Sequence, residues 1–223
     1  FVSAGAKVVV ASRKADACAE TEAHLTAMGG DALGIATHAG VLDDLQALVD
    51  RTVERFGGVD IVVNNAANAL TQPLGEFTPD AWQKSFDVNL RGPVFLVQAA
   101  LPHLRDSEHA AVVNVISAGA FLFSANVAMY AAAKAGMMSF TRSMAADFAP
   151  DGIRVNALAP GTVETDMVRA NPPEAQAAMR RAGLLRRGAE PDEMVGPVLF
   201  LASDASSFMT GQVLLVDGGM VPH

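Results

Sequence analysis

The sequence predicts an α/β fold, a doubly wound parallel sheet with helices on both faces in three layers. Short β-branched runs alternate with longer segments of helical periodicity along the chain. That alternation is typical of parallel strands joined by crossover helices, in which each strand is buried on both sides. We expect strands at 7–11, 32–36, 61–63, 112–116, 154–159 and 213–216, and helices at 15–28, 41–56, 78–90, 93–104, 127–148 and 192–201.

The first half opens on a helical turn, because residues 1–4 precede Gly5, and glycine commonly ends helices. The run K-V-V-V-A at 7–11 has the continuous apolar character of a strand buried on both faces. The helix at 41–56 carries leucine and valine at helical spacing, so one of its faces should enter the core. Gly57 ends it.

The second half continues the alternation. Thr78 is a good helix cap, and Pro79 suits the first helical position. The segment 165–187 is polar, rich in methionine and arginine, and only weakly periodic, so it predicts no single regular element. Its arginines are expected to be individually solvated: Arg180, Arg181, Arg186 and Arg187.

Composition narrows the functional classes. Hydrophobic residues make up 51% and charged residues 18%, which indicates a globular chain and not a disordered one. The net charge of −8 argues against nucleic acid or an anionic membrane as a partner. Cys18, the single cysteine, excludes an internal disulfide and is consistent with a reducing compartment. We expect one domain over residues 1–223, located in the cytoplasm, with no metal site.

One helix carries a pair of side chains suited to proton transfer. Tyr130 is the only tyrosine and Lys134 is one of four lysines, and their spacing places both on one helix face. A nearby cation favours the phenolate and lowers a tyrosine pKa, so the pair can exchange a proton with an alcohol oxygen. Ser117, at the end of the preceding strand, can hold the same oxygen by a hydrogen bond. An exposed structural pair on an alanine-rich helix is the alternative.

Small and polar residues follow several of the expected strands. In an open parallel sheet, ligands bind beyond the carboxyl ends of the strands. This rule places Arg13, Asn65, Ser117 and Thr162 along one edge of the sheet, and it predicts a cofactor crevice there.

Several motifs occur in a fixed order and spacing. They are N-N-A-A at 64–67, Asn89 after a tryptophan-containing helix, V-N-V-I-S at 113–117, Y-A-A-A-K at 130–134, I-R-V-N-A-L-A-P-G-T-V-E-T-D-M at 153–167 and T-G-Q-V-L-L-V-D-G-G at 210–219. With these motifs the chain resembles the short-chain dehydrogenase/reductases over nearly its whole length. The resemblance implies a Rossmann fold and an NAD(P)-dependent oxidoreductase.

The resemblance also implies catalytic roles. Tyr130 would be the general acid/base, and Lys134 would bind the nicotinamide ribose and lower the tyrosine pKa. Ser117 would orient the substrate carbonyl. Asn89 would hold a water that joins Lys134 to a proton relay.

A second implied set binds the cofactor. Tyr130 and Lys134 belong to it as well as to the catalytic set. Asn65 and Ala66 would line the adenosine ribose, and Val163 and Thr165 the nicotinamide carboxamide. The other implied residues are Ser12, Arg13, His38 and Ala39.

Arg13 favours NADP(H), with NAD(H) as the alternative. An acid at the end of this strand would accept the ribose hydroxyls of NAD, whereas an arginine suits a 2′-phosphate. Here the strand ends in Ser12-Arg13-Lys14, with no acid before Asp16.

Two features depart from the family pattern. Many members carry an aspartate beside the adenine, where this chain has His38. The histidine can still contact the adenine edge; a solvated histidine in a turn is the alternative. The family also opens with a central strand and a Gly-rich turn that seats the pyrophosphate on a helix N-terminus. Residues 1–5 already match the end of the helix that follows, so the domain is expected to be N-terminally incomplete.

The resemblance predicts an NADP(H)-dependent enzyme that interconverts a secondary alcohol and a ketone. Alternatives are a 3-oxoacyl-thioester reductase, a sugar dehydrogenase, or an inactive nucleotide-binding or scaffold fragment. Phe121, Phe123 and Met129 indicate either an apolar substrate or core packing, and segment 165–187 is expected to cover the substrate. Similar proteins assemble through two long helices, so a homotetramer or homodimer is expected.

Overall fold

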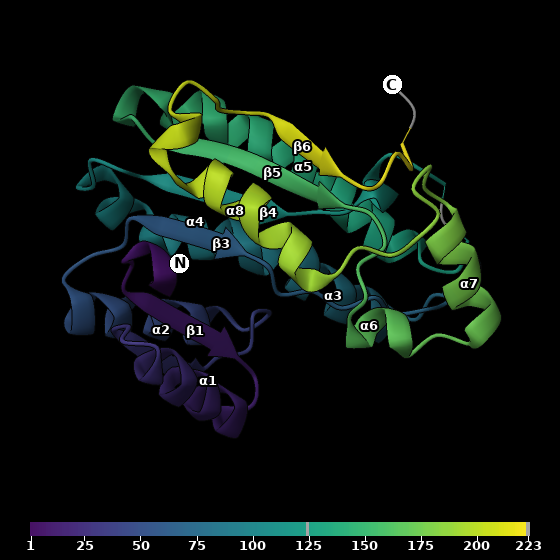
Figure 1. Ribbon diagram of the computed structural model, residues 1–223, viewed down its shortest axis with the longest axis horizontal. Helices are drawn as coiled ribbons and strands as arrows, with labels where there is room; N and C mark the ends of the chain where they lie inside the picture. Colours follow the sequence, from purple (N-terminus) through teal and green to yellow (C-terminus); the bar gives the residue numbers. More distant parts are fainter. Residues whose placement is uncertain (124, 222–223) are drawn as a thin grey trace.

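The computed structural model describes residues 1–123 and 125–221, and it confirms the parallel α/β architecture (Figure 1). The six strands are β1 (Val8–Ser12), β2 (Ala32–Ala36), β3 (Ile61–Asn64), β4 (Ala111–Val115), β5 (Arg154–Pro160) and β6 (Val213–Val216). The α-helices are α1 (Ala15–Ala27), α2 (Leu42–Phe56), α3 (Pro79–Phe86), α4 (Gly92–Arg105), α5 (Ala128–Phe148), α6 (Asp166–Arg169), α7 (Pro173–Arg181) and α8 (Val195–Ala202).

The strands form two parallel sheets. One has the order β1-β2 and the other the order β3-β4-β5-β6. Helix α8 contacts β4 and β5 on one face, and α4 and α5 contact strands of the same sheet from the opposite face (Figure 1). Helix α2 packs against α4 and links the two sheets. Within the described residues no strand lies between β1 and β3, which is why the expected single sheet is split.

Two segments differ locally from their expected structure. Thr78 caps α3 as expected, its Oγ1 accepting from the Ala81 amide at 3.2 Å. The chain then passes without interruption through a π-helical turn, Asp87–Arg91, into α4. Pro93 explains the turn, because a proline lacks the N–H that α-helical bonding requires there. The weakly periodic segment 165–187 forms the short helices α6 and α7.

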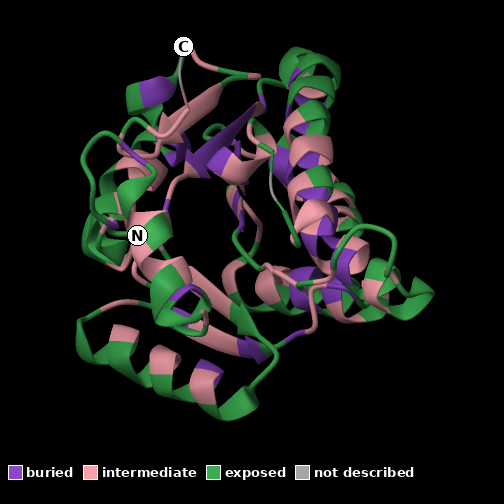
Figure 2. Cartoon of the chain, turned by 90° about the vertical axis from the view of Figure 1, so that its right-hand side faces the viewer, coloured by how far each residue is buried: buried purple, intermediate pink, exposed green. Residues whose placement is uncertain are grey.

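Burial is concentrated in the larger sheet, as Figure 2 shows. β4 has four of its five residues buried, whereas β1 has none, and its last two residues are exposed. Neither of the two core clusters formed by described residues includes a side chain from β1. β1 therefore has the sequence of a buried strand without the corresponding burial.

Within the part of the chain that the structure describes, no helix combines the length and hydropathy needed to cross a membrane.

Candidate active site

Ser117, Tyr130 and Lys134 come together where β4 ends. Ser117 lies two residues beyond β4, and its Oγ accepts from the Gly119 amide at 3.1 Å. Tyr130 and Lys134 lie in the first turns of α5, and the Lys134 Nζ is 5.7 Å from the centre of the tyrosine ring. Lys134 Nζ donates to the Val115 carbonyl at 2.7 Å, so the lysine is fixed to the end of the strand that presents Ser117.

Burial controls the protonation of this group. It raises the pKa of Tyr130, and the Ser117 hydroxyl lowers that pKa only in part. The sequence predicted a lowered tyrosine pKa from the neighbouring lysine, and the structure gives the opposite direction because desolvation of the phenolate dominates. Burial also lowers the pKa of Lys134 to about 8, since its side chain is buried away from water. The phenol is therefore in its acid form at neutral pH.

The lowered pKa of Lys134 makes stability depend on pH. Below about pH 8 the lysine is charged in both states and burial of the charge destabilises the fold in full. Between about pH 8 and 10.5 the unfolded chain keeps the proton that the folded chain has lost, so stability rises with pH. The free energy of unfolding of the native protein, compared with Lys134→Met, should rise by about 2 kcal/mol between pH 7.5 and pH 10. Urea unfolding at both pH values measures this, and a difference that is constant with pH would contradict it.

Asn89 lies in the π-helical turn and is completely buried. Its Nδ2 donates to the Ser85 carbonyl at 2.9 Å and to the Asn68 carbonyl at 2.8 Å, and its Oδ1 accepts from the Asn68 amide at 3.1 Å. The side chain thus ties the loop after β3 to the helix. Residue 93, four positions later, is a proline, so the Asn89 carbonyl has no α-helical donor from that position.

The predicted adenosine-side residues meet at one cavity. Its volume is about 1060 Å³, and its lining includes residues that follow β1, β2 and β3. Among them are Ser12, Arg13, His38, Ala39, Asn65 and Ala66. The other predicted site residues lie in the π-helical turn, after β4, in α5 and after β5, and they do not line this cavity: Asn89, Ser117, Tyr130, Lys134, Val163 and Thr165.

The turn that carries His38 is held in a defined geometry. The His38 Nδ1 accepts from the Gly40 amide at 3.1 Å, and the His38 amide donates to Asp44 at 2.8 Å. Because Nδ1 accepts, the neutral ring carries its proton on Nε2, which can donate to a ligand. Gly92 fits closely behind this turn: a Cβ there would lie 1.8 Å from the Ala39 carbonyl oxygen.

Arg13 is exposed at the mouth of this cavity, directly after β1. Within residues 1–123 and 125–221 no carboxylate forms an ion pair with it. Its guanidinium is therefore available to an anionic ligand such as a phosphate.

The segment after β5 is fixed by backbone and ionic contacts. Val163 pairs with Ala189 in an isolated parallel bridge, and the Thr165 amide donates to the Val163 carbonyl at 2.7 Å. Glu164 forms a two-bond ion pair with Arg180 at 2.7 and 2.8 Å.

The expectation of individually solvated arginines is wrong at two positions. Arg180 pairs with Glu164, and Arg187 forms a two-bond pair with Glu193 at 2.6 and 2.8 Å. Each pair joins groups at least six residues apart in the sequence, and helical periodicity does not reveal such contacts.

The three apolar residues near the site separate into two kinds. Met129 is a core residue, whereas Phe121 is partly exposed and Phe123 is 99% exposed. Leu184 and Leu185, which follow α7, are also exposed. Met129 therefore serves core packing. The four exposed side chains, of two phenylalanines and two leucines, form apolar surface that could contact a substrate.

The sequence analysis did not predict a buried chain of side-chain hydrogen bonds that lies beside the site. Asn64 Nδ2 donates to Asn114 Oδ1 at 2.8 Å, and Asn114 Nδ2 donates to Thr141 Oγ1 at 2.9 Å. The chain joins the ends of β3 and β4 to α5, one residue before the carbonyl that holds Lys134. Asparagines near the ends of two strands expected to be buried were the available signal, because buried amides need partners.

Comparison with known proteins agrees with this arrangement. A sequence family described as "Enoyl-(Acyl carrier protein) reductase" matches residues 1–221. A cis-4-hydroxycyclohexanecarboxylate dehydrogenase from Sinomonas cyclohexanicum is 38% identical over 216 residues, covering 96% of this chain and 86% of that protein. An L-rhamnose 1-dehydrogenase (NAD(P)(+)) from Azotobacter vinelandii is 35% identical over 224 residues, covering 97% and 87%.

A solved structure of another dehydrogenase is also similar to this chain. A gluconate 5-dehydrogenase from Burkholderia cenocepacia, in complex with NADP and tartrate, superposes with a TM-score of 0.92 at 33% identity. The match covers 98% of this chain and 87% of that one. From these similarities, the chain belongs to the short-chain dehydrogenase/reductase family of NAD(P)-dependent oxidoreductases.

Proposed function

We propose that this protein is an NADP(H)-dependent oxidoreductase that interconverts a secondary alcohol and a ketone, with Tyr130 as general acid/base. The observation that carries the proposal is the group formed at the end of β4 by Ser117, Tyr130 and Lys134, in which the lysine is buried and the other two are half-buried. Relatives named as alcohol and sugar dehydrogenases support the reaction class.

The residues present fit the adenosine and nicotinamide ends of a dinucleotide. Arg13 would bind the 2′-phosphate, and the His38 Nε2–H and Asn65 would face the adenosine. Lys134 would donate to the nicotinamide ribose, and Val163 and Thr165 would face the carboxamide through their fixed backbone. Ser12, Ala39 and Ala66 are small enough to let the adenosine approach the backbone. When bound, this cofactor supplies or accepts the hydride.

In ketone reduction the chain's own residues move one proton. The Ser117 hydroxyl donates to the substrate oxygen and orients the carbonyl. Tyr130, whose raised pKa keeps it protonated at neutral pH, donates its phenolic proton to that oxygen as negative charge develops on it. Lys134 stabilises the phenolate that remains. A water held at Asn89 would return a proton through Lys134.

Exposed apolar side chains favour a substrate with an apolar carbon skeleton. Phe121, Phe123, Leu184 and Leu185 lie in segments that follow β4 and α7. The segment with α6 and α7 would cover this side of the site. We expect a cyclic ketone, because the Sinomonas relative is named for a substituted cyclohexane alcohol.

A sugar dehydrogenase is the second candidate, because two of the similar proteins are named for rhamnose and gluconate. NADPH consumption over a panel of cyclic ketones, sugar ketones and 3-oxoacyl thioesters separates the candidates. Turnover highest with cyclic ketones is expected. Turnover confined to sugars or thioesters would reassign the substrate, and none at all would favour a nucleotide-binding or scaffold role.

We also infer a homodimer or homotetramer formed through α4 and α5. Both helices expose a phenylalanine, Phe95 on α4 and Phe140 on α5, and α5 is rich in small alanines that allow close helix contact. Sedimentation velocity measures the stoichiometry, and a monomer at micromolar concentration would contradict the inference.

A further inference from the structure

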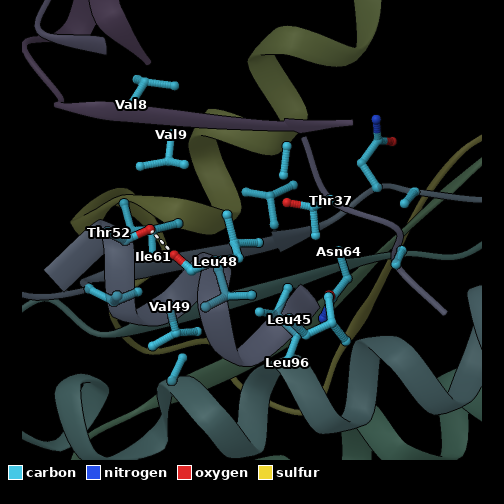
Figure 3. Close-up of a pocket in the computed structure, with 18 of the residues that line it drawn as sticks. Val8, Val9, Thr37, Leu45, Leu48, Val49, Thr52, Ile61, Asn64 and Leu96 are labelled. Carbon is cyan, nitrogen blue, oxygen red and sulfur yellow. Dashed lines mark hydrogen bonds between the residues drawn. The ribbon is translucent and has the colours of Figure 1, made fainter. Parts of the chain in front are cut away.

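Asn68 directly follows the N-N-A-A motif and connects two parts of the site. It lines the large cavity that the predicted adenosine-side residues share. Figure 3 shows Asn64, the last residue of β3 and the start of the loop that leads to Asn68, among the side chains that line this cavity. Asn68 also bonds to Asn89, which does not line the cavity. Asn68 therefore lies where the cavity meets the π-helical turn.

The backbone and the side chain of Asn68 both bond to this turn. The Asn68 amide donates to Asn89 Oδ1 at 3.1 Å, and Asn89 Nδ2 donates to the Asn68 carbonyl at 2.8 Å. Any residue other than proline can form these two backbone bonds at this position. The asparagine side chain adds two more: its Oδ1 accepts from Asn89 Nδ2 at 3.0 Å, and its Nδ2 donates to the Lys84 carbonyl at 2.9 Å. The side chain thus ties the loop after β3 to the last turn of α3 and to the π-helical turn.

The Asn89 side-chain amide is fully engaged by its neighbours. It is completely buried, and its Nδ2 has three acceptors at 3.0 Å or less, which are the Asn68 carbonyl, the Asn68 Oδ1 and the Ser85 carbonyl. An amide nitrogen carries only two hydrogens, so it has none left for another partner. These contacts hold the Asn89 side chain in one orientation, and Asn68 supplies two of the three.

Helix α5 packs on the same π-helical turn. Lys134 lies on this helix, and a Cβ added to Gly136, two residues later, would lie 3.3 Å from the Cδ2 of Leu90. Leu90 directly follows Asn89 in the turn. The turn therefore contacts both α5 and the loop of Asn68, and a change in its position would move Asn89 relative to Lys134. Short π-helical segments inside longer helices often occur at functional sites.

We propose that Asn68 is a positioning residue for the proton relay: its side chain holds Asn89, and with it the π-helical turn, at a fixed place beside Lys134. This inference rests on the proposed function, in which a water held at Asn89 returns a proton through Lys134. Asn68 acts through Asn89 and exchanges no proton with the substrate. Among the described residues, it is the only one that both lines the cavity and bonds to the Asn89 side chain.

Hydrogen exchange tests the positioning without cofactor or substrate. In the unaltered protein the Asn89 side-chain amide should exchange slowly with deuterated water, because it is buried and bonded. Asn68→Ala should speed this exchange by about ten-fold, the effect of one lost hydrogen bond, as measured by NMR of isotopically labelled protein. Equal exchange rates in Asn68→Ala and the unaltered protein would overturn the proposal.

Lys84→Ala is the matched control for both kinds of measurement. It removes the exposed side chain of the other partner and keeps the backbone carbonyl that accepts from Asn68. The exchange rate of the Asn89 amide and the kcat for ketone reduction should both stay at the values of the unaltered protein. An effect of Lys84→Ala as large as that of Asn68→Ala would indicate a general loosening of α3 and would overturn the specific role of Asn68.

Kinetics test the link between Asn68 and the relay. With the best ketone of the panel, Asn68→Ala should lower kcat by about ten-fold and change the KM values for the ketone and NADPH by less than about two-fold. Imidazole at about 0.1 M, a small proton donor near neutral pH, should restore most of the lost kcat, because it supplies the proton that the relay no longer delivers. Lost packing alone would not respond to imidazole.

The outcomes separate this inference from the proposed function. Normal turnover in Asn68→Ala, or a lowered kcat that imidazole does not restore, would overturn the relay role while the unaltered protein remains an active reductase. No turnover by the unaltered protein with any compound of the panel would overturn the proposed function and the relay role with it. The exchange rates would still decide whether Asn68 positions Asn89, because they require no activity.

Discussion

Replacing Tyr130 with phenylalanine should lower kcat for ketone reduction by about 10²–10⁴-fold, the range for loss of a general acid. The ring and its packing remain, because only the phenolic oxygen is removed. Burial holds this phenol in the protonated form at neutral pH, so the wild-type enzyme has a ready proton donor and the variant has none. Steady-state NADPH oxidation with the best ketone of the panel gives the comparison.

Two controls accompany this variant. Ala132→Ser adds a hydroxyl to an exposed position on the same helix and should leave kcat unchanged. The affinity of Tyr130→Phe for NADPH, followed by nicotinamide fluorescence, should fall by no more than about ten-fold, the effect of one lost hydrogen bond. Unaltered turnover in Tyr130→Phe would remove the tyrosine from the proposed mechanism.

Arg13→Ala should raise the KM for NADPH by about 10–100-fold and leave the KM for NADH nearly unchanged. Hydrogen bonds to charged groups contribute about 1.5–3 kcal/mol each, and the 2′-phosphate is the group that NADH lacks. Arg13 has no ion-pair partner among the described residues, so its charge is available to this phosphate. The ratio of kcat/KM for the two cofactors is the measurement.

Lys14→Ala is the matched control, because Lys14 is the adjacent exposed cation. It should change the cofactor ratio by less than Arg13→Ala. Equal effects of both variants would indicate a general positive field without specific recognition. A preserved NADPH preference in Arg13→Ala would contradict the assignment.

Strand and helix positions followed closely from the sequence. β2 and β6 have the expected limits, and α2 begins one residue later than expected. The continuous valine run of β1 correctly indicated a parallel strand. β-branched residues are enriched in strands, and an unbroken apolar run is typical of parallel sheets. The π-helical turn at Asp87–Arg91 was not expected, since it depends on how Pro93 is accommodated inside a longer helix.

Only part of the candidate site could be predicted from the sequence. The spacing of Tyr130 and Lys134 correctly placed them one turn apart, because helical geometry is local. The direction in which the tyrosine pKa shifts was predicted wrongly, because it depends on how far the fold excludes water from the phenol. The Asn64–Asn114–Thr141 chain and the Glu164–Arg180 pair also join distant segments.

The sequence alone determined the family, the order of the elements and the residue types available for proton transfer and cofactor binding. These features depend on local periodicity and motif spacing, which the order of residues fixes directly. The tertiary structure decided the protonation of Tyr130 and Lys134 and the anchoring of the lysine on Val115. Each of these depends on desolvation or on contacts between distant segments, and both arise only when the chain is packed.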